Sequence, residues 1–158
     1  MSRAIAIHFF ETGARAVQVE VRGGRIALVS QAEVVWDAEV DHARGRQLAA
    51  ELAPWKPGRT PVVAALARKD LKWQSFDLPP APEEDLADLV HLQSDRDQAV
   101  GDEMVLDFLA LEGSAEQSYR IWAVAASRAS IASIKAICSG ANLTLAALAP
   151  VELGWPLL

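Results

Sequence analysis

The sequence predicts an α+β fold. Segments with the short apolar runs or the alternation typical of strands occupy residues 4–35, 61–78, 104–126 and 143–148. Helical spacing of apolar residues instead follows Asp41, Glu83 and Ser127. The two kinds of segment do not alternate strictly, which favours mixed sheets with separate helices over a parallel α/β fold. The length of 158 residues suits about one domain of roughly 150 residues.

The first 35 residues are expected to form a β-meander. Residues 4–10 are apolar, residues 11–13 have the composition of a turn, and residues 14–22 alternate between two faces. Gly23 and Gly24 then supply a two-residue hairpin turn, because glycine reaches positive φ without steric cost. Residues 25–35 follow as the third strand.

The next segment predicts a helix and then a pair of strands. Asp41 is expected to cap a helix over residues 42–52, since its side chain can accept from the first backbone N–H groups. Residues 61–67 and 71–78 read as two strands. Because only a short polar connection separates them, we expect these strands to form a hairpin.

The second half predicts two more helices and three strands. Acidic residues 83–85 favour a helix start by their interaction with the helix dipole, and this helix runs to about residue 95. Two strands, residues 104–111 and 118–126, flank a turn at residues 112–114. Ser127 is expected to cap the following helix and Gly140 to end it in the C′ position. Residues 143–148 form the last strand.

The composition excludes several classes of protein. Fifteen basic against 21 acidic residues give a net charge of −6, which argues against a general nucleic-acid binder. The single Cys138 allows no internal disulfide. The N-terminal apolar run is too short for a secretory signal, and residues 143–151 fall well below the ~20 residues that span a bilayer. We therefore expect a cytoplasmic or peripheral protein that does not itself insert into a membrane.

Catalytic and metal-binding motifs receive little support. Glu84, Asp88, His91 and Asp95 share one helical face and could in principle hold a cation, but a solvated acidic face is the favoured interpretation. Cys138 lies on an apolar stripe and is expected to be a small buried hydrophobe. No nucleophile elbow, dinucleotide fingerprint or P-loop occurs. The motifs thus predict no catalytic residues, no metal site and no cofactor.

Four landmarks in the second half carry a resemblance to a known family. They read VVAAL at residues 62–66, FDLPPAPEEDL at 76–86, DEMVLDF at 102–108, and AVAAS at 123–127 continuing to SGANL at 139–143. In this order they resemble the inserted subdomain of the actin-like type IV pilus assembly protein PilM family. The secretion protein GspL and the cell-division protein FtsA share the architecture more loosely.

The resemblance implies a division of the chain. Residues 1–60 would be a partial actin-like, ribonuclease H-like first subdomain made of the three-stranded meander and a helix. Residues 61–150 would be a PilM-like inserted α+β module of the strand–helix–strand–strand type. Residues 151–158 would be a tail.

The N-terminal hairpin departs from the pattern of actin-like ATPases. Those proteins open with a segment of the type IGIDIGSSSVKAV, whereas residues 5–17 here read IAIHFFETGARAV. His8 replaces the metal-organising Asp, and Phe10 replaces a glycine of the phosphate turn. A bulky ring prevents close backbone approach to phosphate, and imidazole suits hydrated magnesium poorly. His8, Phe10, Thr12 and Gly13 are thus expected to be degenerate phosphate-loop positions.

The resemblance also implies a role. The second actin-like half, with its second phosphate loop and adenosine motif, is not among these 158 residues, so alone the chain is expected to form no nucleotide cleft. The leading hypothesis is a non-catalytic cytoplasmic scaffold, peripheral at the inner membrane, that binds the N-terminal tail of a PilN-like single-span protein and other platform proteins. One lobe of a divergent actin-like ATPase is the alternative, and a stand-alone enzyme of unknown class is a third possibility.

Overall fold

Two compact units make up the structure, a computed structural model that describes residues 2–96 and 103–150. Within these residues it contains eight strands in two sheets and three α-helices, which confirms the α+β prediction. Contacts group Met1–Arg68 with Ile131–Leu158 in unit 1, and Lys69–Ser130 in unit 2.

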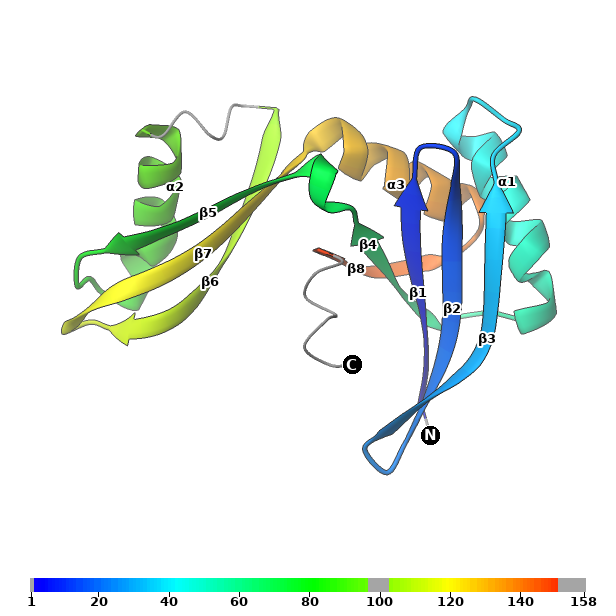
Figure 1. Cartoon of the computed structure of the whole chain (residues 1–158), viewed down its shortest axis with the longest axis horizontal. Helices are drawn as coiled ribbons and strands as arrows, with labels where there is room; N and C mark the ends of the chain where they lie inside the picture. The colour runs from blue at the N-terminus through cyan, green and yellow to red at the C-terminus, as the bar shows by residue number, and fades with distance from the viewer. Residues whose placement is uncertain (1, 97–102, 151–158) are drawn as a thin grey trace. The chain divides into compact units, whose positions relative to one another are not determined.

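Unit 1 is built on a five-stranded sheet (Figure 1). Its strands, in spatial order, are β3 (Arg25–Val35), β2 (Gly13–Arg22), β1 (Ser2–Phe10), β4 (Pro61–Leu66) and β8 (Thr144–Pro150). The first three are antiparallel, so the predicted meander is confirmed. β4 pairs parallel to both β1 and β8. This arrangement places β3 and β8 at the two edges of the sheet.

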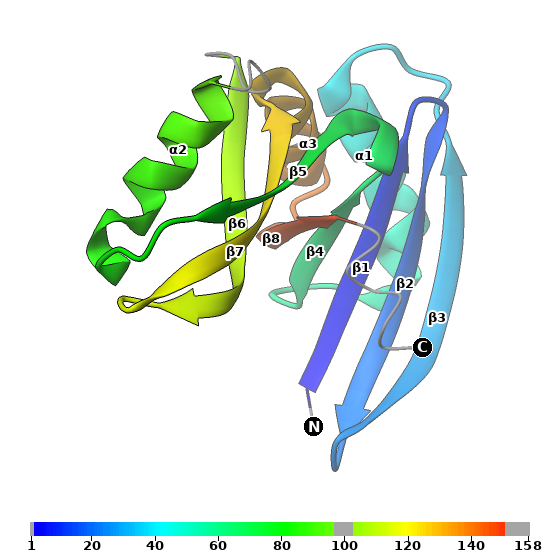
Figure 2. The same cartoon turned by 60° about the vertical axis from the view of Figure 1, so that its left-hand side comes forward.

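Helices α1 (Asp41–Leu52) and α3 (Arg128–Gly140) cover one face of this sheet (Figure 2). Ile5 and Ile7 of β1 are fully buried on that face, as are Val62 of β4 and Leu48 of α1. Alternation along each strand therefore directs the larger apolar side chains toward the helices. Gly45 of α1 lies so close to α3 that an added Cβ would sit 2.5 Å from the Ile137 carbonyl oxygen.

Unit 2 is a three-stranded antiparallel sheet with one helix. β5 (Leu71–Leu78), β7 (Gln117–Ser127) and β6 (Met104–Ser114) lie in that order. A 3₁₀ turn, η3 (Glu83–Asp85), leads into α2 (Leu86–Arg96). Leu86 and Val90 of α2 pack with Leu78, Tyr119 and Ile121 of the sheet in one buried cluster. The element order confirms the predicted strand–helix–strand–strand pattern.

The chain enters and leaves unit 2 at neighbouring residues. Leu71, at the start of β5, is paired with Ala126, near the end of β7. Paired antiparallel residues have Cα atoms about 5 Å apart. Unit 2 is therefore inserted between β4 and α3 without separating the strands of unit 1.

The predicted hairpin of residues 61–67 and 71–78 is wrong. β4 pairs with β1 and β8, whereas β5 pairs with β7 in the other sheet. The contacts also differ from the expected division at residue 60, because hydrogen bonding places both β4 and β8 in the sheet of unit 1. A helical turn at Arg68–Asp70 separates the two strands and prevents a tight hairpin.

The predicted ends of two helices need correction. Asp41 is the first helical residue of α1, and its Oδ1 lies 3.6 Å from Nη1 of Arg44. Val40 occupies the N-cap position and makes no side-chain hydrogen bond there. α3 includes Gly140, and Asn142 adopts the left-handed conformation expected for C′. The Leu143 and Asn142 N–H groups close this end as a Schellman motif by donating to the Cys138 and Ser139 carbonyls, each at 2.9 Å.

The predicted turn at residues 112–114 is also displaced. β6 continues to Ser114 and β7 begins at Gln117, so the turn lies at residues 115–116. Gly113 stays within the strand with a φ of 130°. Two register shifts in this pairing show that the end of the hairpin is irregular, which explains how a glycine is accommodated before the turn.

Candidate functional site

The four positions compared with a phosphate loop, His8, Phe10, Thr12 and Gly13, lie at the end of the β1–β2 hairpin. Phe10 and Gly13 form the last pair of the hairpin, and residues 11–12 make the turn itself. The Trp36 N–H donates to the Thr12 carbonyl oxygen at 2.9 Å, which ties the turn to the segment that follows β3. The backbone of this turn is thus held from two sides.

Gly13 is required here by packing. A Cβ at this position would overlap the Val34 carbonyl oxygen and lie 2.9 Å from Cε2 of the Phe10 ring. Real Cβ atoms do not approach other atoms this closely, so a larger residue would displace β3 or the ring. The glycine lets β2 lie close to β3 and makes room for Phe10.

Phe10 has a ring neighbour and a cationic neighbour. The His8 ring is 6.0 Å from the Phe10 ring, at an interplanar angle of 56°. The Arg15 guanidinium carbon lies 5.8 Å from the centre of the Phe10 ring, within cation–π range. His8 and Arg15 are also paired across β1 and β2. Nε2 of His8 is buried and has no hydrogen-bond partner among the described residues.

Arg15 is joined to Glu33 of β3 by two hydrogen bonds. Its Nε donates to Oε2 at 3.1 Å and its Nη2 to Oε1 at 3.4 Å. The pair is formed because a bulge between Gln18 and Val19 shifts the β2–β3 register. The Glu33 carboxylate is therefore paired with the Arg15 guanidinium beside Phe10. An incoming phosphate would meet an aromatic ring and a negative charge at this turn.

The possible metal-binding residues lie on the outside of unit 2. Glu84 belongs to η3, whereas Asp88, His91 and Asp95 lie on α2, and all four side chains are exposed. Between residues 2–96 and 103–150, no group of three or more His, Cys, Asp or Glu is arranged to hold a metal ion. The solvated acidic face stays a prediction.

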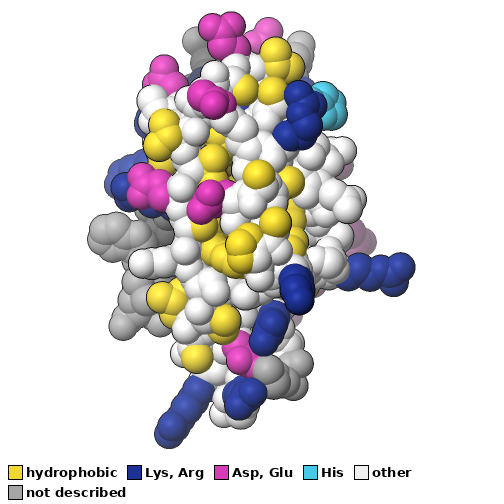
Figure 3. Space-filling view, turned by 90° about the vertical axis from the view of Figure 1, so that its right-hand side faces the viewer, with side chains coloured by type: hydrophobic (Ala, Val, Ile, Leu, Met, Phe, Trp, Pro, Cys, Tyr) yellow, Lys and Arg dark blue, Asp and Glu magenta, His cyan; other side chains and the backbone are white. Residues whose placement is uncertain are grey.

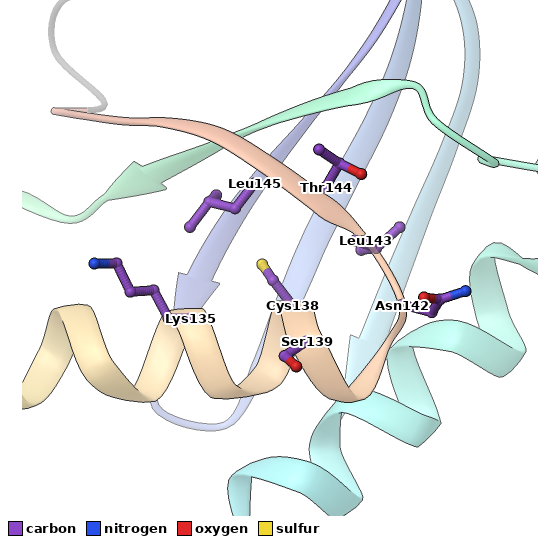
Figure 4. Close-up of a pocket in the computed structure, with 7 residues that line it drawn as sticks. All are labelled: Lys135, Cys138, Ser139, Asn142, Leu143, Thr144 and Leu145. Carbon is purple, nitrogen blue, oxygen red and sulfur yellow. The ribbon is translucent and has the colours of Figure 1, made fainter.

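A hollow of about 250 Å³ opens between α3 and β8 (Figure 4). Its residues are Lys135, Cys138, Ser139, Asn142, Leu143, Thr144 and Leu145. Cys138 is buried, as expected from the apolar stripe. Burial raises the pKa of the Cys138 thiol from 9.0 to about 11, so the thiol stays protonated at neutral pH and is a poor nucleophile. Sequence reasoning missed this hollow, because α3 and β8 meet only through the fold.

No helix within the described ranges is long and apolar enough to cross a membrane. Neither the protein-family models nor the curated proteins contain a match to this chain. Solved structures do match. One is a chain of a PilM–PilN type IV pilus biogenesis complex, with 19% identity, a TM-score of 0.83, and coverage of 98% of this chain and 49% of that one.

Another is the cytoplasmic domain of EpsL, an inner-membrane component of the type II secretion system of Vibrio cholerae. Its identity is 14% and its TM-score 0.69, over 94% of this chain and 57% of that domain. This chain thus spans about half the length of both neighbours. At such identities the likeness is one of fold, and the fold of this chain is the one found in the matching parts of the PilM–PilN complex and of cytoplasmic EpsL.

Proposed function

We propose that this chain is a non-catalytic scaffold on the cytoplasmic side of a type IV pilus or type II secretion platform, peripheral to the inner membrane. The observation that carries the proposal is the likeness of nearly the whole chain to part of the PilM–PilN complex. The likeness to EpsL, an inner-membrane component of a secretion system, supports the same kind of location.

The partner in this proposal is a PilN-like single-span inner-membrane protein whose N-terminal tail docks on the chain. In the described part of the chain, each sheet ends in strands with unpaired backbone groups: β3 and β8 in one, β5 and β6 in the other. An extended tail can pair with such an edge and gain affinity from main-chain hydrogen bonds. Side chains beside the edge would then select the tail.

Titration calorimetry with synthetic PilN-like tails tests this proposal. We expect saturable binding that a scrambled tail of equal composition does not reproduce. Burial of apolar surface should also give a negative heat-capacity change. If neither a tail nor any other platform protein binds the folded chain, the scaffold proposal fails.

The absence of catalysis is part of the proposal, and the β1–β2 turn supports it. Phe10 fills the space beside Gly13, and Arg15 is engaged by Glu33. Phosphate-binding turns instead offer close backbone N–H groups and an available positive charge. A protonated Cys138 gives no support for nucleophilic chemistry.

One lobe of a divergent actin-like ATPase is the second candidate function. The observation in its favour is that both structural neighbours continue well beyond the part matched by this chain. A second lobe in a longer protein could supply the rest of a nucleotide site. Calorimetry with ATP and Mg²⁺ on such a longer protein distinguishes the candidates: the scaffold proposal expects no binding heat, and saturable binding would favour the ATPase.

A further inference from the structure

The β8 edge of the unit 1 sheet lacks the charges and internal prolines that protect many edge strands from pairing. Among the described residues β8 has one neighbouring strand, β4, so the backbone groups along its other side have no strand partner. The strand contains no charged residue, and Pro150 is its last residue. A register shift leaves Ala146 unpaired, and this small residue and Ala147 are exposed. The edge is therefore open to an added strand.

The hollow between α3 and β8 lies directly beside this edge, with a volume of about 250 Å³. Figure 4 shows the Cys138 sulfur pointing from α3 toward β8 and the Leu145 side chain pointing from β8 toward α3, with Lys135 at one end. Side chains of a strand alternate between the two faces of its sheet, so every second side chain of an added strand would point to the face that carries α3. One apolar side chain of such a strand can therefore enter the hollow.

The charge around the hollow is positive, although the net charge of the chain is −6. Residues 128–150, which include α3 and β8, contain two basic residues, one of them Lys135, and no acidic residue. Arg59 is exposed and lies two residues before Pro61, which pairs with the first residue of β8. Asp41, in the helix that packs against α3, is already paired with an arginine. These surroundings favour a negatively charged ligand.

The other three edge strands of the described residues differ from β8 in charge. Figure 3 views the side where β3 is the outer strand, and it shows acidic and basic side chains together with hydrophobic ones. Each of these strands contains at least one acidic residue: Glu33 in β3, Asp77 in β5, and Asp107 and Glu112 in β6. Of the four edges, β8 is thus the one that combines a hollow with positive surroundings and no acidic residue.

We propose that β8 and the hollow beside it bind an extended acidic segment of a partner protein. The segment pairs with β8 through main-chain hydrogen bonds, places an apolar side chain in the hollow, and places a carboxylate two residues away beside Lys135. This partner differs from the tail proposed above, because cytoplasmic segments next to a membrane span carry an excess of Lys and Arg. The site therefore goes beyond the scaffold proposal and does not depend on it.

A synthetic peptide of two Thr-Leu-Thr-Glu repeats tests this site. Its leucines and glutamates are two residues apart, so they share one face of a strand. Fluorescence anisotropy of the labelled peptide, titrated with the full chain, measures the affinity. We expect saturable binding, and binding weaker by about tenfold or more when serine replaces leucine, because the hollow then loses its apolar side chain.

Charge reversal tests the position of the carboxylate. Lys135→Glu should weaken binding by at least about fivefold, because a repulsion replaces an ion pair. A peptide with lysine in place of glutamate should instead bind Lys135→Glu better than it binds the wild type. Lys72→Glu makes the same charge change on β5, another edge strand, and should leave binding unchanged. Both lysines are exposed, and circular dichroism verifies that both variants are folded.

Methylation of the peptide backbone tests strand pairing without changing the protein. An added strand directs the N–H groups of alternate residues toward its neighbour. Methylating the nitrogens of one alternate set should therefore abolish binding, and methylating those of the other set should preserve it.

Any one of four results would overturn the site: no saturable binding, equal effects of Lys135→Glu and Lys72→Glu, equal effects of the two methylation patterns, or peptide-induced amide shifts that map to an edge strand other than β8. Because the assay contains no PilN-like tail, its result is independent of the tail titration. A failure of the scaffold proposal and a failure of this site therefore give different results.

Discussion

Two glycines bring α1 and α3 into backbone contact. A Cβ on Gly45 would lie 2.5 Å from the Ile137 carbonyl oxygen and 2.8 Å from the Cα of Gly140. A Cβ on Gly140 would in turn lie 3.1 Å from the carbonyl oxygen of His42. In a helix, alanine is normally preferred to glycine by up to about 1 kcal/mol, so the absence of a side chain at Gly45 is explained by this contact.

Gly45→Ala is therefore expected to destabilise the protein by about 1–3 kcal/mol, because overpacking exceeds the gain in helix propensity. Urea unfolding followed by circular dichroism measures the change. Ala50→Gly, at an exposed position of the same helix, is the control and should cost about 1 kcal/mol through propensity alone. An increase in stability for Gly45→Ala would contradict the close contact.

Cys138 should make stability fall at high pH. Its thiol has a pKa near 9.0 when exposed and about 11 when buried in the folded chain. Below pH 9 both states hold the proton. Between pH 9 and 11 the unfolded thiol ionises while the folded thiol stays protonated, so about 2–3 kcal/mol of stability is lost across this range.

Urea unfolding of the wild type and of Cys138→Ala between pH 8 and about pH 11 checks this prediction. The free energy of unfolding should fall more steeply with pH in the wild type, because only that protein contains the thiol. Other groups that titrate in this range affect both proteins alike. Equal slopes would show that the thiol is not shielded from solvent.

At the scale of the element, Ser127 determines where α3 begins. Its Oγ accepts from the Ala129 N–H at 3.1 Å and the Ser130 N–H at 3.3 Å, as the sequence predicts for an N-cap. Ser127 is also the last residue of β7. At the point where the strand ends and the helix begins, the Ser127 hydroxyl thus gives both of these N–H groups a hydrogen-bond acceptor.

Removing this cap should destabilise the fold measurably. Ser127→Ala is expected to lower the free energy of unfolding by about 1 kcal/mol. Ser127→Asp should retain most of the stability that the cap contributes, because a carboxylate can also accept from the first N–H groups of the helix. Ser139→Ala, at an exposed position later in the same helix, is the control and should change little. Equal effects of Ser127→Ala and Ser139→Ala in chemical unfolding would remove the capping role.

At the scale of the whole molecule, the chain should divide at the ends of unit 2 into two parts that each fold alone. Since Leu71 and Ala126 are paired, a short Gly-Ser linker replacing residues 69–130 should preserve the five-stranded sheet. Residues 69–130 alone should fold as a marginally stable domain of about 60 residues. Amide dispersion in NMR spectra tests both fragments. Removing residues 61–150 is the control, and it should abolish folding because β4 and β8 leave the sheet.

How much the sequence predicts depends on how local the interaction is. The β2–β3 turn follows from Gly23 and Gly24, and the cap of α3 follows from Ser127, because neighbouring residues determine both. The pairing of β4 is different. Its apolar run is typical of a strand buried between parallel neighbours, but the pattern does not name those neighbours.

The same distinction applies to the candidate site. His8, Phe10 and Gly13 can be recognised as departures from a phosphate loop by their positions in the first hairpin. The contact of Arg15 with Glu33 cannot be predicted in this way. If the pairing ran without interruption from the Gly23-Gly24 turn, Arg15 would be opposite Ala32. The bulge at Gln18/Val19 shifts the pairing by one residue, and no residue pattern at that point predicts a bulge.

The paired ends of unit 2 have a mechanical consequence. If residues 68 and 131 are pulled apart, the load falls first on the Leu71–Ala126 pair, and the β5–β7 ladder then opens one hydrogen-bonded pair at a time. A ladder opened from its end resists force far less than strands loaded along their length. A pull applied at these two points is therefore expected to unfold unit 2 from its connected ends, by unzipping rather than by shear.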